Sequence, residues 1–330
     1  MRFGYGLITC QRYPGETRTD SEIYGEALEL CTEAETLGFD SVWTSEHHFN
    51  DDSYMPSLLT FSAAVAARTS RIEIGTGLVL APLYHPLRLA EDAATVDVIS
   101  GGRLILGLGM GWNEWEFEAL GVPIRERVAR TVDAIEICRQ AWGPGRVESA
   151  GVGIYPKPAR PGGPPIWLGA NADRSIRRAA KIADGWIDAE PTKEDFTVHL
   201  EWLRDALGSR DDFEIAGYWP VFVSNDGDAW ELVRESDHYI DWKYEDAEGA
   251  RGRTESLKEP PQLDAKAEEI LRRTMVCGTP DEVAARIRSL QEIAGPRFTF
   301  IARGYYPGMD RALMRSSTRL FAEEVIPRLA

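Results

Sequence analysis

Two adjacent histidines are the residues of this sequence whose chemistry is easiest to interpret. His47 and His48 follow a predicted strand at residues 40–45, in the order Glu46-His47-His48-Phe49. An imidazole titrates near neutral pH, so it can give or take a proton during a reaction. A metal site and a structural pair hydrogen-bonded in the core are the two alternatives. Neighbouring residues of a strand point to opposite faces, so the two histidines could not easily bind one ion. We therefore predict no bound metal. We predict catalytic roles for His47 and His48.

Glycines gather in the next two predicted strands, at residues 72–80 and 103–108, and in the turn after them. They are Gly75, Gly77, Gly107, Gly109 and Gly111. A residue without a side chain lets a flat ring lie against the backbone. The alternative is that small residues only relieve crowding where strands converge. Trp112 stands where a dinucleotide-binding motif has its third glycine, so the glycine string is weak evidence for a dinucleotide site.

A possible phosphate site follows the predicted strand at residues 166–169. The segment Asn171-Ala172-Asp173-Arg174-Ser175 opens a helix there. The first turn of a helix has unpaired N–H groups and a favourable dipole, which suit a phosphate, and Ser175 adds a hydroxyl. An asparagine that merely caps the helix gives the same pattern. The residues alone leave both interpretations open.

Strand-like and helix-like segments alternate along the chain and determine where these residues lie. The predicted strands span residues 3–9, 40–45, 72–80, 103–108, 166–169, 184–189, 214–224 and 298–302. Such strands pair in parallel, because each connection returns over a helix. Even spacing and the missing dinucleotide motif favour an α/β fold of the (β/α)8 TIM barrel type over an open doubly wound sheet. In such barrels the functional residues follow the carboxyl ends of the strands.

Residues 234–274 are too long for a simple connection between the seventh and eighth strands, and they are rich in charge. We predict a partly helical, mobile insertion that covers the pocket as a lid, within a single domain of residues 1–330. Aromatic residues here and after the last strand predict an aromatic-lined pocket mouth, although ordinary packing is an alternative. They are Tyr239, Trp242, Tyr244, Tyr305 and Tyr306.

The composition excludes several classes of partner. The 330 residues are 43% hydrophobic, enough for a large core, and carry a net charge of −16. An acidic surface repels phosphate backbones and anionic membranes, so neither nucleic acid nor a membrane is an expected partner. The four cysteines form no Cys-x-x-Cys pair, which indicates reduced thiols. No signal-peptide pattern and no apolar run of about 18 residues is visible, so we expect a cytoplasmic protein.

The order and spacing of short motifs resemble the bacterial luciferase-like monooxygenases across nearly the whole chain. The motifs are Phe3-Gly4, Gly38-Phe39-Asp40 with Val42-Trp43, Glu46-His47-His48-Phe49, Gly75-Thr76, Pro82 with His85-Pro86 and Glu91-Asp92, Gly102-Arg103 before Gly107, Gly278-Thr279-Pro280, and Val325-Ile326-Pro327. The resemblance implies a homodimeric enzyme that receives reduced flavin mononucleotide (FMN) from a separate flavin reductase. With molecular oxygen, such an enzyme oxidises a small organic substrate at carbon or sulfur.

The resemblance also implies roles for individual residues. His47 matches the family's catalytic histidine, and its neighbour His48 is the second candidate. The residues that match the lining of the flavin ring are Gly77, Leu78, Gly109 and Met110. Those that match the surroundings of the phosphate are Asn171, Ala172 and Ser175.

Departures from the family pattern keep other functions open. Bacterial luciferase itself carries cysteine and then arginine where this chain has Gly109 and Met110, and that arginine helps to hold the phosphate. The candidates to replace it are Arg174, Arg177 and Arg178.

The segment Gly109-Met110-Gly111-Trp112-Asn113, with Glu114, Glu116 and Glu118, instead resembles relatives that use a deazaflavin coenzyme for hydride transfer. A flavin-binding protein without catalysis is a third possibility, against which His47 argues. The His-His-Phe motif favours the FMN-dependent monooxygenase.

Overall fold

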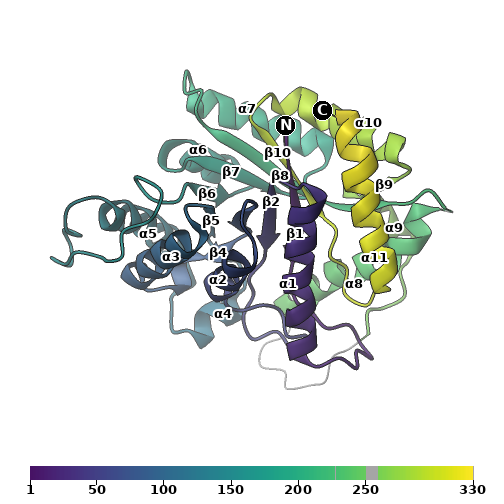
Figure 1. Cartoon of the computed structure of the whole chain (residues 1–330), viewed down its shortest axis with the longest axis horizontal. Coiled ribbons are helices and arrows are strands. Elements are labelled where there is room, and N and C mark those ends of the chain that lie inside the picture. The colour runs from purple at the N-terminus through teal and green to yellow at the C-terminus, as the bar shows by residue number, and fades with distance from the viewer. Residues whose placement is uncertain (227, 250–258, 330) are drawn as a thin grey trace.

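Parallel strands close into a barrel in the computed structural model (Figure 1), which describes residues 1–226, 228–249 and 259–329. The barrel strands are β1 (Arg2–Ile8), β2 (Ser41–Thr44), β3 (Glu73–Thr76), β5 (Leu104–Gly109), β6 (Ile166–Gly169), β7 (Gly185–Ala189), β8 (Glu214–Val223) and β10 (Phe298–Arg303). β10 pairs with both β8 and β1, which closes the sheet. The predicted (β/α)8 barrel is therefore confirmed.

Two short strands lie outside the predicted set. β4 (Val79–Leu80) pairs with β5, and β9 (Val276–Gly278) pairs with the end of β8. The segment at residues 72–80, predicted as one strand, is thus interrupted at Gly77 and Leu78, which are joined by a cis peptide bond. Leu78 packs against the cluster of side chains inside the barrel.

Helices alternate with the strands and cover the outside of the barrel (Figure 1). They are α1 (Asp20–Leu37), α2 (Leu58–Arg68), α3 (Pro86–Ser100), α4 (Glu114–Ala119), α5 (Arg127–Trp142), α6 (Asp173–Ile182), α7 (Lys193–Leu207), α10 (Pro280–Ala294), α11 (Arg311–Leu320) and α12 (Ile326–Leu329). Local signals set their ends. Thr19 and Glu22 form a capping box at the start of α1, and Gly38 ends it with a left-handed φ of 88°.

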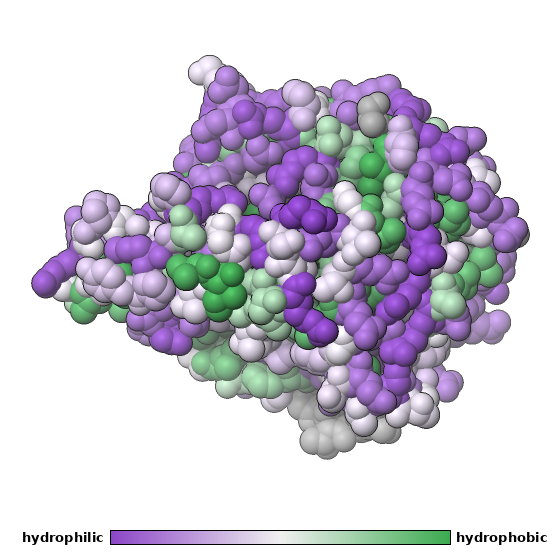
Figure 2. Space-filling view, viewed as in Figure 1, coloured by the Kyte–Doolittle hydropathy of each residue, from purple (hydrophilic) through white to green (hydrophobic). Residues whose placement is uncertain are grey.

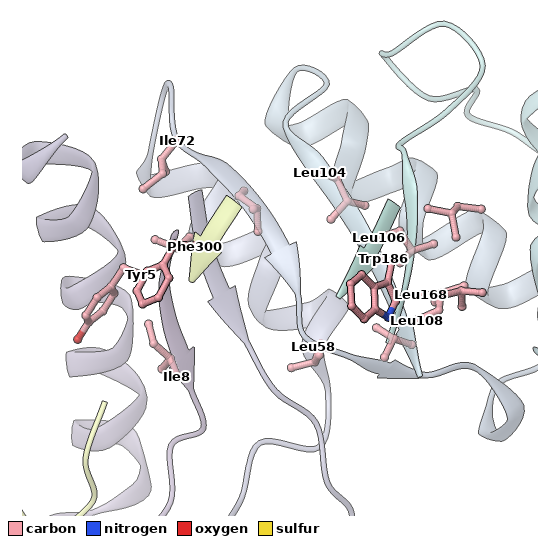
Figure 3. Close-up of a cluster of buried hydrophobic side chains, with 14 of the residues drawn as sticks. Tyr5, Ile8, Leu58, Ile72, Leu104, Leu106, Leu108, Leu168, Trp186 and Phe300 are labelled. Carbon is pink, nitrogen blue, oxygen red and sulfur yellow. The ribbon is translucent and has the colours of Figure 1, made fainter. Parts of the chain in front are cut away.

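The core has two layers, one inside the barrel and one between strands and helices. The side chains inside the barrel are Leu7, Trp43, Ile105, Trp167, Ile187, Ala216 and Ile301. Neighbouring positions of β5, such as Leu104 and Leu106, belong to the outer layer (Figure 3). Gly75 makes room for the inner layer, because a Cβ there would lie 2.3 Å from the ring of Trp43. At Gly75, therefore, the glycine relieves crowding.

Two helices lie between β8 and β9, in the region predicted as an insertion. They are α8 (Ala229–Gly249) and α9 (Ala265–Thr274). Residues 250–258 of the predicted insertion lie outside the described part of the chain. α8, α9 and β8 share a second, smaller core, formed by Phe222, Ala229, Trp230, Val233, Tyr239, Ile240, Leu271, Met275 and Tyr306. Motion of this segment as a lid stays a prediction.

The face seen in Figure 2 is largely hydrophilic, with smaller apolar patches. Some apolar side chains are exposed: Phe49, next to the two histidines, is 55% exposed, and Ile270 of α9 is 54% exposed. Among the helices that the structure describes, none is both long and apolar enough to cross a membrane.

Candidate active site

His47 lies after β2 and is held by a buried carboxylate. Its Nδ1 is 3.0 Å from Oε1 of Glu116, a fully buried residue of α4. The same oxygen accepts a hydrogen bond from the backbone N–H of His48 at 2.7 Å. A carboxylate in this position favours the proton on Nδ1 and fixes the orientation of the ring. Nε2 then carries the lone pair that can exchange a proton with a ligand.

Aromatic rings enclose His47 on several sides. The ring centroids of Tyr54, Tyr244 and Trp112 lie 4.9, 5.0 and 5.8 Å from that of His47. The hydroxyls of Tyr54 and Tyr244 are 3.3 Å apart. Because Tyr244 belongs to α8, the region predicted as an insertion contacts the predicted catalytic residue directly.

His48 belongs to a separate group of side chains. Its Nε2 is 2.9 Å from Oε1 of Glu46, whose other oxygen accepts a hydrogen bond from the hydroxyl of Tyr84 at 3.1 Å. Burial would lower the pKa of His48, but the hydrogen bond and charge of Glu46 outweigh it and raise that pKa. The two histidines therefore do not face a common point, and the described residues contain no group of metal-binding side chains.

The residues predicted to line the flavin ring come together at the ends of β3 and β5. A Cβ on Gly109 would lie 3.2 Å from the side chain of Leu78, and one on Gly169 would lie 2.1 Å from it. Leu78 therefore occupies the space that these two glycines leave open. Met110, the next residue, has its Sδ 3.8 Å from a guanidinium nitrogen of Arg178.

The residues predicted to surround the phosphate lie at the start of α6. Ala172 is the N-cap residue, and no side chain caps this helix, so the alternative of an ordinary asparagine cap does not apply. Asn171 and Ala172 are exposed, and Ser175 is half-buried. Of the candidate arginines, Arg177 is engaged by Asp173 and Asp205, whereas Arg178 contacts Met110. Arg178 thus connects this helix with the residues predicted to line the flavin ring.

A cavity of about 330 Å³ lies between the strand ends and the two helices α8 and α9. His47 does not line it, but Tyr54 and Tyr244, whose rings contact that of His47, do. Its walls are Leu7, Thr9, Tyr54, Ala189, Glu190, Tyr218, Asp237, Ile240, Asp241, Tyr244, Ile270, Leu271, Thr274, Arg303 and Tyr305. The expected aromatic lining holds for Tyr244 and Tyr305. Tyr239 and Tyr306 belong to the smaller core instead.

A charged cluster in this cavity, in which Arg303 and Asp237 are buried and the side chain of Glu190 is 29% exposed, was not predicted. The guanidinium of Arg303, at the end of β10, is 2.6 Å from Glu190 and 2.6 Å from Asp237. Burial raises the pKa of Glu190 to about 7 and that of Asp237 to about 6, although the charge of Arg303 lowers both. Asp241 lines the same cavity. The cluster joins β7, β10 and α8.

Part of this cluster carries a sequence signal. Glu190 and Arg303 directly follow the predicted strands at residues 184–189 and 298–302, at the ends where barrel enzymes place functional residues. Asp237 has no comparable signal, because it lies within a helix of the predicted insertion. Only the packing of α8 brings it to Arg303.

The sequence profile described as luciferase-like monooxygenase matches residues 1–296 of the chain. The chain belongs to the luciferase-like monooxygenase family. The predicted resemblance is confirmed, and the barrel, His47 and the strand-end residues can be compared with those of relatives in this family.

Relatives of the luciferase-like chain differ in cofactor. The F420-dependent glucose-6-phosphate dehydrogenase of Nakamurella multipartita is 29% identical, over 100% of this chain and 96% of its own. The oxygenase component of the flavin-dependent trigonelline monooxygenase of Acinetobacter baylyi is 32% identical, over 53% of this chain and 50% of its own. The crystal structure of the monooxygenase RslO1 from Streptomyces bottropensis has a TM-score of 0.85 and 28% identity, with 100% of both chains covered. The similarity to these relatives supports the interpretation of this protein as an oxidoreductase.

Proposed function

We propose that this luciferase-like protein is a monooxygenase that uses reduced FMN and molecular oxygen to oxidise a small organic substrate. The observation that carries the proposal is the His47–Glu116 pair, which two tyrosines connect to the 330 Å³ cavity: Tyr54 and Tyr244 contact the ring of His47 and line that cavity. The likeness to a monooxygenase over the whole chain supports the same reaction class.

The residues at the strand ends fit FMN. Gly77, Leu78 and Gly109 would support the ring, and the uncapped start of α6 with Arg178 would hold the phosphate. The reduced flavin supplies the two electrons with which molecular oxygen is activated. A separate flavin reductase would deliver it, and the naming of a relative as an oxygenase component supports such a partner. A homodimer stays a prediction.

In this proposal the protein's own residues bind the substrate and move one proton. Glu116 holds Nδ1 of His47, so Nε2 accepts or donates the proton that the reaction requires. The tyrosines and aliphatic side chains of the cavity exclude water and pack against the substrate. Arg303, Glu190 and Asp237 supply its charged wall.

A second candidate function is hydride transfer with coenzyme F420. It is favoured by the F420-dependent relative, which matches the chain over its full length. The segment from Gly109 to Asn113, which resembles deazaflavin-dependent relatives, supports it as well.

Anaerobic titration with reduced FMN, FAD and F420 tests the two candidates. We expect reduced FMN to bind most tightly, because the start of α6 offers one phosphate site. A flavin reductase, NADH and oxygen are then added with a panel of candidate substrates, and oxygenated products are identified by mass spectrometry. Preferential binding of F420, with F420 reduction in the absence of oxygen, would establish the second candidate instead.

A further inference from the structure

A second cavity, of about 240 Å³, lies between the start of α7, the end of α9 and the helix α10. Its lining is formed by Thr192, Lys193, Glu194, Trp219, Arg273, Arg286, Ser289 and Leu290. Trp219 stacks on Phe300 in the layer between strands and helices. The cavity therefore lies outside the barrel and apart from the candidate active site.

Positive charge dominates this second cavity, although the whole chain has a net charge of −16. The side chains of Lys193, Arg273 and Arg286 are exposed, and within the described residues none of them forms an ion pair with a carboxylate. Glu194 is the only carboxylate in the lining. By contrast, the neighbouring Arg272 is 2.9 Å from Glu268 and lies over the ring of Trp230. Three neighbouring cations repel one another unless an anion lies between them.

The other polar groups of the lining are already hydrogen-bonded. The hydroxyl of Thr192 caps α7 by accepting from the N–H of Asp195. The indole N–H of Trp219 donates to the carbonyl of Pro191 at 2.8 Å, and the hydroxyl of Ser289 donates to the carbonyl of Arg286 at 2.8 Å. The guanidinium of Arg286 also donates one hydrogen bond, to the backbone carbonyl of Arg273. The remaining hydrogen-bonding capacity is that of the other ammonium and guanidinium donors. Such donors select oxyanions such as phosphate or carboxylate.

We propose that this cavity is an anion-binding site for a phosphate or carboxylate group, separate from the flavin phosphate site at α6. Its effect on the protein follows from the position of Arg273. Leu271 and Thr274, on either side of it, line the 330 Å³ cavity between the strand ends and α8 and α9. Arg286 already links α10 to α9 through the carbonyl of Arg273. An anion held by Arg273, Lys193 and Arg286 would strengthen that link, add one to α7, and so fix one wall of the first cavity.

Inorganic phosphate is the probe for this site. Flavin-free protein is titrated with phosphate by calorimetry, with sodium chloride keeping the ionic strength constant. We expect saturable binding, weakened about tenfold or more by Arg273→Gln or Arg286→Gln, as for the loss of a hydrogen bond between charged groups. Arg272→Gln is the matched control, because its side chain is paired elsewhere, and it should leave the affinity unchanged.

Titration with reduced FMN tests whether phosphate binds in this second cavity or in the proposed flavin phosphate site at α6. Binding of FMN that is unaffected by saturating phosphate, and by Arg273→Gln, supports a separate site. Competition between FMN and phosphate would overturn it, since the phosphate would then occupy the flavin site. Absence of saturable binding, or an equal loss in Arg272→Gln, would overturn the anion site itself. The first titration contains no flavin, so it remains decisive even if the monooxygenase proposal fails.

Discussion

At the scale of single residues, His47 and Glu116 form the contact on which the proposed chemistry depends. They are 69 positions apart in the sequence, and their side chains meet at 3.0 Å. We expect His47→Ala to keep the fold and the bound flavin but to lower turnover by roughly 100- to 10,000-fold, the usual contribution of a general acid or base. Turnover in the reductase-coupled assay and the melting temperature are measured on the same preparation.

His48→Ala is the control for this prediction, because His48 contacts Glu46, whereas His47 contacts Glu116 and the cavity-lining Tyr54 and Tyr244. Its effect on turnover should be much smaller. A large drop in melting temperature for His47→Ala, with near-normal turnover per folded molecule, would show that His47 is structural. The catalytic assignment would then have to pass to His48 or Glu46.

Leu78 and Gly169 provide a second prediction at this scale. Gly169→Ala would place a methyl group 2.1 Å from Leu78, so the leucine side chain, which is predicted to line the flavin ring, must move. Because Leu78 is predicted to line the ring, we expect reduced FMN to bind about tenfold more weakly, a change of about 1.4 kcal/mol in binding free energy. Anaerobic fluorescence titration measures the affinity.

Gly169→Ala in a Leu78→Ala background tests whether Leu78 causes the loss of FMN affinity. Without the leucine side chain, Gly169→Ala should cost little further affinity, and the two changes should be non-additive. Additive losses would mean that Leu78 does not transmit the effect of the methyl group.

At the scale of elements, α8 and α9 form the wall of the active-site cavity opposite the strand ends. We predict that amides of residues 234–274 exchange hydrogen rapidly in the free protein and more slowly with flavin or substrate bound, as those of a lid do. Hydrogen exchange followed by mass spectrometry measures this. Exchange that is slow from the start and unchanged by ligand would identify the segment as a fixed part of the scaffold.

The sequence predicts elements best where their signals are local. The capping box of Thr19 and Glu22 and the stop at Gly38 define α1 within a few residues. Thr279 and Glu282 form an equal capping box at the start of α10. β9 had no such signal, because its three residues become a strand only by pairing with the end of β8.

The residues of the candidate site also divide into those that have a local sequence signal and those that have none. Strand-end residues such as His47 and Gly109 could be found from their positions after predicted strands. The partnership of His47 with Glu116, and that of Arg303 with Asp237, depends on how α4 and α8 fold back over the barrel. Periodicity and capping carry no information about such distant contacts.

At the scale of the whole molecule, the Glu190–Arg303–Asp237 cluster makes stability depend on pH. Burial raises the pKa of Glu190 from 4.5 to about 7 and that of Asp237 from 3.8 to about 6. The folded protein therefore holds these protons more tightly than the unfolded chain. Their contribution to stability is fully present in acid and is lost as the pH rises from about 4 to about 7. Each pKa unit corresponds to about 1.4 kcal/mol.

We predict that Glu190→Gln makes the free energy of unfolding less dependent on pH across this window. Arg303 keeps its contact with Asp237 in this variant, so the protein should fold. Urea unfolding at several pH values measures the slope, and Glu194→Gln, at an exposed carboxylate, is the control. A slope equal to that of the unmodified protein would argue against a raised pKa at Glu190.

The pairing of β1 with β10 has a consequence for synthesis on the ribosome. Residues 2–6 of β1 pair with residues 299–303, so one edge of β1 has no partner until about 300 further residues have been translated. At about 5–20 residues per second, this delay is roughly 15–60 s. An unpaired strand edge is a template for association with other chains. The yield of active protein should therefore depend on chaperones that bind the nascent chain before β10 leaves the ribosome.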